Sequence, residues 1–294
     1  MSERVFVIGG TGNTGKPVVE ALLKANVPTT VLARTPEKVH QMFPSSVNNS
    51  NFTIVKGDVT DYALFEKSIV GHTRLFFVVN GFGNMIETKV TLAAKAYAAG
   101  VKQVVDVSSL SSGFPWRSSF IGVHHRSCEE GILAIPNRGA YVALRPSRFM
   151  SNMLWIDIHG IKANNTVYDT AEPDEREEWI SPNDIGALAA IVLLDPVEKH
   201  GDAVYEMVGD YITPTKRAAV FSEALGREIK YQQISLPEKY KQLNSHLPHA
   251  MAYELSIPFG GDGNPKRPAA LSILLGREPE TVEQWIKANK NGFL

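Results

Sequence analysis

The stretch Val5-Phe6-Val7-Ile8-Gly9-Gly10-Thr11-Gly12-Asn13-Thr14-Gly15 decides the fold of this chain. It opens with apolar, valine-rich residues that favour a buried strand, and the residues after Gly15 have the pattern of a helix. Between them the glycines have the spacing Gly9-x-x-Gly12-x-x-Gly15. In a strand–turn–helix unit this spacing is typical of a loop that binds the pyrophosphate of a dinucleotide.

Each glycine of such a loop has a physical purpose. The first permits a tight turn, the second lets the backbone approach a pyrophosphate, and the third lets the helix pack closely on the strand. The helix N-terminus then offers unpaired N–H groups and the positive end of its dipole. The alternative is a glycine-rich turn without a ligand. We expect cofactor contacts from Gly9, Thr11, Gly12, Asn13, Thr14 and Gly15.

The end of the second strand predicts which dinucleotide binds. Proteins of this design that use NAD usually place an acid there, which binds the 2′-hydroxyl of the ribose. In this chain Arg34 stands at that position, the first acid is Glu37, and Lys38 follows. A guanidinium matches a 2′-phosphate with two hydrogen bonds, so we expect NADP(H), bound by Arg34 and Lys38. The alternative is a solvated arginine at a strand end.

The first two-thirds of the chain alternate short apolar runs with helical patterns. The runs predict strands at Val5–Ile8, Thr29–Ala33, Phe52–Lys56, Leu75–Val79, Gln103–Val107 and Tyr141–Leu144. The helical patterns lie at Gly15–Ala25, Pro36–Phe43, Ala63–Ile69, Met85–Ala99 and His124–Ala134. Strands that are apolar on both faces belong to parallel sheets covered on both sides. The alternation therefore indicates an α/β protein with a Rossmann fold, a doubly wound parallel sheet with helices on both faces.

After Pro146 this alternation stops. Residues 146–180 have the pattern of a polar loop with aromatic islands. Later patterns predict helices at Pro182–Leu194, Pro214–Leu225, Pro237–Leu243, His249–Leu255 and Thr281–Ala288, strands at Ala203–Met207 and near Ile229–Gln232, and a break at residues 260–265. We expect an NAD(P)-binding Rossmann core at residues 1–150, completed by residues 180–208. Residues 151–179 and 209–294 then form a smaller, mostly helical substrate-binding or lid region.

Further cofactor contacts are expected where other strands end, because ligands of open α/β sheets bind beyond the carboxyl ends of the strands. Asp58 follows the third strand, where it accepts from the adenine amino group or caps the helix that starts near Asp61. Val59 lies beside it, and Asn80 and Gly81 follow the fourth strand.

Several motifs together resemble a known family. They are the glycine loop, Leu32-Ala33-Arg34, Gly57-Asp58-Val59-Thr60-Asp61, Val107-Ser108-Ser109, Leu144-Arg145-Pro146-Ser147-Arg148-Phe149-Met150-Ser151-Asn152 and Trp179-Ile180-Ser181-Pro182-Asn183-Asp184-Ile185-Gly186. In these motifs the chain is similar to the NmrA-like group of atypical short-chain dehydrogenases/reductases, NAD(P)-binding Rossmann proteins that include the isoflavone-reductase-like ones. The resemblance implies an NADPH-dependent reductase of quinones, imines or double bonds, or a regulator that binds NADP without turnover.

The resemblance also indicates where catalytic groups would lie. Ser108 and Ser109 end the fifth strand, where extended relatives carry a catalytic Ser or Thr, although both could satisfy backbone groups instead. Of the Tyr and Lys used by the wider superfamily, the Tyr position is filled by Ile121 and the Lys position by His125. The standard proton donor is therefore absent.

His125 is the remaining catalytic candidate, with Ser109 and Ser108. Glu129 lies four residues further and hence on the same helical face, where a carboxylate could fix the tautomer of the imidazole and raise its pKa. Such an imidazole suits a proton donor or a hydrogen bond to the nicotinamide ribose, or it only orders the helix and cofactor. We expect His124 to be structural or solvent-facing, and Cys128 to be a packed helical cysteine.

Hydride transfer needs no protein nucleophile, because the cofactor carries the chemistry. The protein has to hold an apolar substrate and exclude water. For the substrate pocket we expect Phe82, Phe114, Trp116, Phe149, Asn152, Trp155 and Trp179, although each aromatic could be ordinary core. We expect no metal site, since His246-x-x-His249 lacks a third ligand.

Composition limits the partners. The 294 residues carry a net charge of −1, with 30 basic and 31 acidic residues, so a surface for nucleic acid or anionic membrane is not expected. A single cysteine fits a reducing compartment, and the first strand leaves no room for a signal peptide. We therefore expect a cytoplasmic protein, monomeric or homodimeric, whose partner is a small-molecule substrate.

Three functions remain open from the residues. The favoured one is an NADPH-dependent reductase of an apolar or aromatic small molecule with a C=O, C=N or conjugated C=C bond. The second is an NADP-binding redox sensor without turnover, which the missing Tyr favours. The third is a redox-neutral isomerase or cyclase on the same scaffold.

Overall fold

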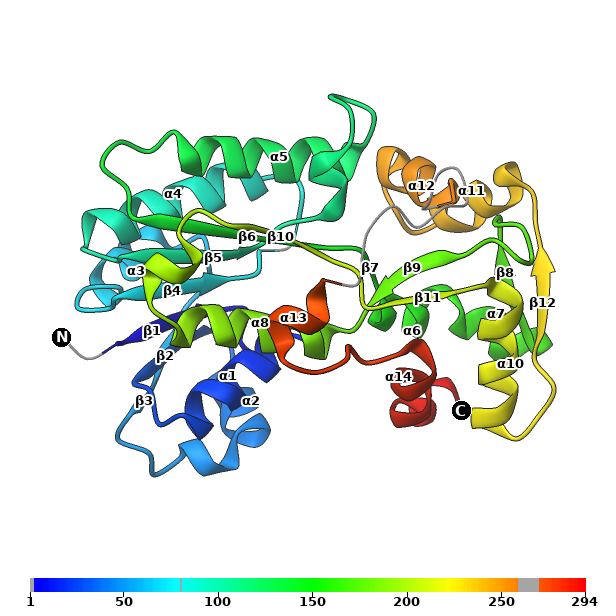
Figure 1. Cartoon of the computed structure of the whole chain (residues 1–294), viewed down its shortest axis with the longest axis horizontal. Coiled ribbons are helices and arrows are strands. Elements are labelled where there is room, and N and C mark those ends of the chain that lie inside the picture. The colour runs from blue at the N-terminus through cyan, green and yellow to red at the C-terminus, as the bar shows by residue number, and fades with distance from the viewer. Residues whose placement is uncertain (1–2, 80, 259–269) are drawn as a thin grey trace. The chain divides into compact units, whose positions relative to one another are not determined.

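The computed structural model describes residues 3–79, 81–258 and 270–294. The chain divides into two compact units (Figure 1). Unit 1 comprises Met1–Arg145 and Ile185–Glu206, and unit 2 comprises Pro146–Asp184 and Met207–Leu294. The segment 185–206 thus returns to the first unit after the chain has passed through the second.

Unit 1 is built on a seven-stranded sheet of order β10-β6-β5-β4-β1-β2-β3. Its strands are β1 (Val5–Ile8), β2 (Thr29–Ala33), β3 (Phe52–Lys56), β4 (Arg74–Phe77), β5 (Gln103–Val107), β6 (Ala140–Pro146) and β10 (Val204–Met207). The pairs from β3 through β6 are all parallel. Parallel strands end at the same edge, so the loops after β1, β2, β4 and β5 share the carboxyl edge of the sheet.

Helices cover both faces of this sheet. They are α1 (Gly15–Lys24), α2 (Pro36–Met42), α3 (Tyr62–Ser68), α4 (Met85–Ala98), α5 (Phe120–Leu133), α8 (Pro182–Leu194) and α9 (Val197–His200). On one face Phe6 and Phe77 pack in a buried cluster with side chains of α3, α4 and α5. On the other face α1 approaches Val7, and α8 lies against α1 where Gly186 meets Pro17. The sheet is therefore doubly wound, as predicted.

Unit 2 contains two small sheets, of order β11-β9-β7 and β12-β8. Its strands are β7 (Arg148–Phe149), β8 (Thr166–Asp169), β9 (Glu177–Ile180), β11 (Asp210–Ile212) and β12 (Lys230–Gln233). Its helices are α6 (Met153–Ile156), α7 (Ile158–Asn164), α10 (Pro214–Leu225), α11 (Leu236–Asn244), α12 (His249–Ser256), α13 (Leu271–Leu275) and α14 (Val282–Ala288). A core of its own surrounds Trp179, Phe221 and Trp285.

Most predicted elements of unit 1 are confirmed within one or two residues. Residues 146–180 are different, because the predicted loop contains β7, two short helices, β8 and β9. Elements of two to seven residues are too short to show a period, and pairing with distant strands stabilises them. The predicted break at residues 260–265 lies outside the described residues. Within the described ranges no helix is long and apolar enough to cross a membrane.

Candidate active site

The glycine loop joins β1 to α1 at the carboxyl edge of the sheet. Gly9 has a φ of +84°, which only glycine adopts without strain, and a Cβ there would lie 3.0 Å from the carbonyl oxygen of Val78. At Gly15 a Cβ would lie 2.2 Å from the carbonyl oxygen of Gly9, so this glycine permits the close contact of helix and loop. Gly12 is exposed, and among the described residues a Cβ there would meet only the Gly9 oxygen, at 3.3 Å. A ligand can therefore approach Gly12 where a side chain would stand, although the N–H of Gly12 donates to the carbonyl oxygen of Gly9 at 3.0 Å.

The N-terminus of α1 is also prepared for an anion. Thr14 is the N-cap residue, but in the described part of the chain its side chain makes no capping hydrogen bond, and the first turn carries no acidic residue. The N–H of Lys16 already donates to the carbonyl oxygen of Gly12 at 2.9 Å, and Pro17 has no N–H. The positive end of the helix dipole, without an acid beside it, favours a phosphate at this place. The loop and this helix end together fit the pyrophosphate of a dinucleotide.

Arg34 lies at the end of β2 with 83% of its side chain exposed. Its Nε is 4.0 Å from Oδ2 of Asp58, a long contact that leaves the guanidinium largely in solvent. Lys38 is exposed on the first turns of α2. Two cations are thus available at the edge where the ribose of a dinucleotide is expected.

Asp58 closes the turn after β3. Its Oδ1 accepts hydrogen bonds from the backbone N–H and the hydroxyl of Thr60, at 3.0 and 2.8 Å, and these bonds lower the pKa of the carboxyl. The cap of α3 is Asp61, which accepts from the N–H of Leu64 at 3.0 Å. Of the two roles considered for Asp58, the helix cap therefore belongs to Asp61.

The other expected cofactor contacts are Val59, Asn80 and Gly81. Val59 is half-buried against the core of unit 1. Gly81 is exposed after β4 with a φ of +98°, and a Cβ at this position would meet no atom of the described residues within 4 Å. Asn80 lies outside the described residues.

The two serines after β5 differ in their surroundings. Ser108 is buried, and its hydroxyl donates to Glu129, which also holds Arg145 through two hydrogen bonds. Ser109 is half-buried, and its hydroxyl oxygen accepts from the N–H of Ser111 at 3.2 Å. Ser108 thus belongs to a buried ion-pair network, whereas Ser109 keeps a hydroxyl proton available.

His125 does not pair with Glu129, contrary to expectation, because Glu129 is committed to Ser108 and Arg145. The Nδ1 atom of His125 is buried without a hydrogen-bond partner among the described residues. Its pKa is not raised but lowered well below 6.5, by burial and then by the positive charge of Lys89. A buried nitrogen without an acceptor favours the tautomer with the proton on Nε2. His125 is therefore a neutral imidazole with one N–H to donate.

Sequence reasoning missed part of a ring cluster at this edge. Phe82 contacts His125 with ring centroids 6.1 Å apart, but it also contacts Phe120 at 5.2 Å and His124 at 5.3 Å. The rings of Phe120 and His124 are tilted against each other, with centroids 4.3 Å apart. Ser119, whose hydroxyl accepts from the N–H of Gly122 at 2.7 Å, starts α5 four residues earlier than predicted. That early start brings Phe120 onto the helix, one turn before His124.

A buried lysine lies close enough to this cluster to lower the pKa of His125. Lys89 of α4 is fully buried, and its ammonium donates to Asp106 at 2.6 Å and to the carbonyl of Val107 at 3.0 Å. Tyr141 donates its hydroxyl proton to the other oxygen of Asp106 at 2.9 Å. No sequence signal marks Lys89, because it lies within an ordinary helical pattern.

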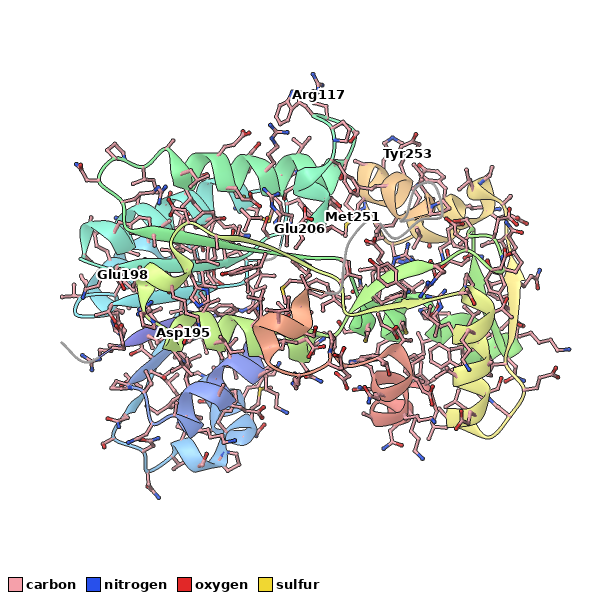
Figure 2. All side chains as sticks on the ribbon, viewed as in Figure 1. Arg117, Asp195, Glu198, Glu206, Met251 and Tyr253 are labelled. Carbon is pink, nitrogen blue, oxygen red and sulfur yellow. The ribbon has the colours of Figure 1, made fainter. Side chains whose placement is uncertain are left out.

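The other predicted pocket residues of unit 1 lie in the loop before α5. Trp116 is exposed, and the guanidinium of Arg126 lies 5.4 Å from its ring centroid. Phe114 is half-buried. Figure 2 shows Arg117 on the same loop, and its φ of +64° is a left-handed conformation. Cys128, by contrast, is buried in α5, and burial raises the pKa of its thiol to about 12, so it is no thiolate nucleophile.

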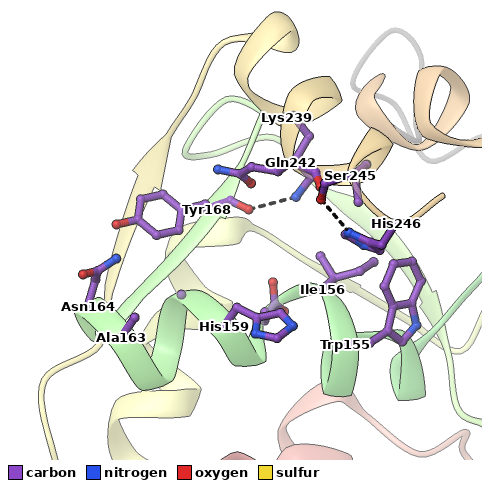
Figure 3. A pocket seen from close by; sticks show the side chains of 13 residues that line it. Trp155, Ile156, His159, Ala163, Asn164, Tyr168, Lys239, Gln242, Ser245 and His246 are labelled. Atoms are coloured by element: carbon purple, nitrogen blue, oxygen red, sulfur yellow. Dashed lines mark hydrogen bonds between the residues drawn. The ribbon is translucent and has the colours of Figure 1, made fainter. Parts of the chain in front are cut away.

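The predicted pocket residues of unit 2 have separate surroundings. Trp155 lines a cavity of about 470 Å³ between α6, α7 and α11, which His159 and His246 also line (Figure 3). Its indole N–H donates to Asn152 at 3.3 Å. Phe149 is half-buried in β7.

Trp179 is fully buried in the core of unit 2. The guanidiniums of Arg148 and Arg217 lie 4.9 and 5.0 Å from its ring centroid. These arginines in turn pair with the buried carboxylates of Asp169 and Glu177. The Trp179 ring is thus enclosed by the core of unit 2 and by these two guanidiniums.

Comparison with known proteins identifies the family of this chain and proteins of similar fold. A sequence model of the NmrA-like family matches residues 1–264. The chain belongs to the NmrA-like family. Its fold resembles the NADPH-dependent quinone oxidoreductase QOR2 of Escherichia coli, solved with NADPH, with a TM-score of 0.80 and 23% identity over 98% of this chain and 100% of the other.

Two further relatives of this NmrA-like chain have different descriptions. A (4-alkanoyl-5-oxo-2,5-dihydrofuran-3-yl)methyl phosphate reductase of Streptomyces griseus is 28% identical over 84% of this chain and 83% of its own. The negative transcriptional regulator NmrA, solved with NAD, has a TM-score of 0.73 and 15% identity over 98% of this chain and 95% of its own. Proteins similar to this chain are thus described both as reductases and, among the solved structures of this fold, as a regulator.

Proposed function

We propose that this protein is an NADPH-dependent reductase of an apolar or aromatic small molecule with a C=O, C=N or conjugated C=C bond. The observation that carries the proposal is the open Gly9–Gly15 loop at an uncapped helix end, with the exposed Arg34 after the next strand. The descriptions of the E. coli and Streptomyces relatives support it.

Each group of residues around the site has its own role in binding or in catalysis. The Gly9–Gly15 loop and the positive end of the α1 dipole bind the pyrophosphate, and Arg34 with Lys38 binds the 2′-phosphate. The neutral His125 donates its Nε2 proton in a hydrogen bond that orients the nicotinamide ribose. NADPH, when bound, supplies the hydride. The rings of Phe82 and Phe120 cover one side of the reacting groups and exclude water.

Two measurements test this proposal. NADPH oxidation is followed at its absorbance band with a panel of quinones, enones and imines, and turnover of at least one of them is expected. Arg34→Glu should weaken NADPH binding by about 10- to 100-fold, since one charge-assisted pair is worth about 1.5–3 kcal/mol, and should leave NADH binding nearly unchanged. Lys24→Glu, a charge reversal at the far end of α1, is the matched control. No turnover across the panel contradicts the reductase, and an equal loss with NADH contradicts the role of Arg34.

A second function is favoured by one observation. The side chain of Ile121 has no ionisable proton to donate, whereas the wider superfamily has a Tyr at this position. A protein described as a regulator is also among the structural neighbours. An NADP-binding regulator would bind NADPH and turn over none of the panel. A partner protein retained on the immobilised chain with NADP⁺ but not with NADPH would then establish this function.

A further inference from the structure

We propose that His124 is the proton donor that replaces the missing Tyr. This inference rests on the proposed reductase function and names the group that completes its reaction. It differs from the expectation drawn from the sequence, in which His124 is structural or solvent-facing.

Among the described residues, the hydrogen bonding found for His124 uses one of its two ring nitrogens. Its Nδ1 lies 2.8 Å from the carbonyl oxygen of Phe120, one turn earlier in α5. A carbonyl oxygen can only accept, so Nδ1 carries a hydrogen in both charge states. The Nε2 atom, on the opposite side of the ring, is therefore an acceptor in the neutral form and a donor in the charged form. A proton can be gained and lost at Nε2 while the ring stays in place.

Ring contacts hold the imidazole of His124 in place. The centroid of Phe120 lies 4.3 Å away in a tilted arrangement, and that of Phe82 lies 5.3 Å away in a nearly perpendicular one. These two rings and the Phe120 carbonyl fix the plane of the imidazole and hence the direction of its Nε2 atom. His124 is also half-buried rather than enclosed, so water can return the proton after each turnover.

The place of His124 in unit 1 fits this role. Phe82 follows β4 at the carboxyl edge, the edge that also carries the glycine loop. The Phe82 ring contacts both His124 and His125, so the two imidazoles flank one side chain. The same ring thus positions the proposed ribose partner and the proposed proton donor.

Other proton-bearing groups near this edge are less suited. His125 is neutral because burial and Lys89 lower its pKa. Burial raises the pKa of the Cys128 thiol to about 12 and that of Tyr141 well above 10. Ser108 is bound to Glu129, and the Ser109 hydroxyl has no base among the partners found for it in the described ranges. An imidazole is the side chain that changes charge between about pH 5 and 8.

In the proposed reaction a hydride and a proton are transferred to the substrate in turn. The hydride of NADPH reduces the acceptor carbon, which leaves an electron pair on the conjugated oxygen, nitrogen or carbon. The N–H bond at Nε2 of the charged His124 breaks, and a new O–H, N–H or C–H bond forms at that atom. His124 becomes neutral and regains its proton from water. The products are the reduced substrate and NADP⁺.

His124→Phe tests the assignment, because it keeps an aromatic ring in contact with Phe82 and Phe120 and removes the transferable proton at Nε2. It should lower kcat by about 100-fold or more at pH 7, a usual contribution of general acid catalysis. NADPH affinity, measured by cofactor fluorescence, should stay within about twofold. His40→Phe, an exposed position on α2, is the matched control and should behave as the wild type.

One readout separates a catalytic role from a structural one. In His124→Gly, added imidazole should restore part of the lost rate, which it would not do if His124 only supported the helix.

The outcomes distinguish the two proposals. If the wild type turns over a substrate and His124→Phe keeps the rate, His124 is not the donor and the reductase function stands. If added imidazole restores no rate in a folded His124→Gly variant, the donor role is overturned while the reductase function stands. If the wild type turns over nothing, the reductase function and the donor role fall together.

Discussion

At the scale of single residues, buried Arg74 shows how a charged side chain is stabilised at a strand start. The Arg74 guanidinium is 1% exposed, and it donates to Glu3 at 2.9 and 3.0 Å and to Gln103 at 2.6 Å. The hydrogen bonds from Arg74 lower the pKa of Glu3 to about 2, from an ordinary value of 4.5. The interaction therefore makes stability depend on pH.

Glu3→Gln should destabilise the protein near neutral pH. A carboxyl whose pKa is lowered by folding contributes stability above its unfolded value, and loses it as the pH falls through its folded value. The difference in free energy of unfolding between wild type and variant should be full above about pH 4.5 and should vanish towards pH 2. Urea unfolding at several pH values measures it. A difference that stays constant down to pH 2 would contradict the role of this ion pair.

The position of a residue is predictable where one local motif is sufficient. Spacing and chain direction predict that the glycines and Arg34 lie at one edge of the sheet, where the structure has them. Their contacts with a cofactor stay a prediction. The partner of Glu129 was predicted wrongly, because helical spacing indicates His125 whereas tertiary packing brings Ser108 and Arg145. His124 could not be singled out, since its importance depends on Phe82 from a different loop.

At the scale of elements, α5 is the helix on which the site depends. Its first turns carry Phe120, His124 and His125, and it begins at the Ser119 cap. The Ser119 hydroxyl accepts from the N–H of Gly122, and a Cβ at Gly122 would lie 2.3 Å from the carbonyl oxygen of Ser111. The helix start is thus fixed by a hydrogen bond and by close backbone contact.

Ser119→Ala should lower the free energy of unfolding by about 1 kcal/mol, because it removes this capping acceptor. It should also reduce kcat, since the first turns of α5 hold both imidazoles. Ser119→Thr keeps the hydroxyl and is the control. Denaturant unfolding and steady-state kinetics measure the two effects. Equal behaviour of the Ala and Thr variants would show that the cap does not position the helix.

The elements also show why prediction from sequence stopped at Pro146. In unit 1, buried parallel strands and helices of seven residues or more have apolar patterns that are readable along the chain. In unit 2, β7 has two residues and acquires its structure by pairing with β9, near residue 180. Local composition there indicates a loop, because the stabilising partners are distant in sequence.

At the scale of the whole molecule, the two units are stabilised in different ways. Unit 1 has a continuous apolar core around Phe6 and Phe77. In unit 2 the fully buried Arg217 lies among three acids, 3.0 Å from Asp169, 3.5 Å from Asp157 and 3.7 Å from Glu177. Arg148 contacts Glu177 and Lys239 contacts Asp169, but Arg217 is the cation that the described residues bring to the buried Asp157. Loss of Arg217 would leave that carboxylate without compensation.

Arg217→Met should therefore destabilise unit 2 by about 3–5 kcal/mol, the usual effect of breaking a buried pair from one side. Arg227→Met, an exposed arginine of the same unit, should change stability by less than about 0.5 kcal/mol. Chemical denaturation followed by tryptophan fluorescence reports on unit 2 through Trp179, Trp155 and Trp285. Similar stabilities for the two variants would show that the buried network is unimportant.

The uncapped start of α1 has a consequence for the lifetime of the protein. In the described part of the chain no side chain caps this helix and its first turn carries no acid, so a bound dinucleotide supplies the negative charge that such residues provide in other helices. A ligand that binds only the folded chain stabilises it by RT ln(1 + [L]/Kd). Fluctuations in cellular cofactor supply would thus change how much folded protein survives proteolysis, before any substrate is present.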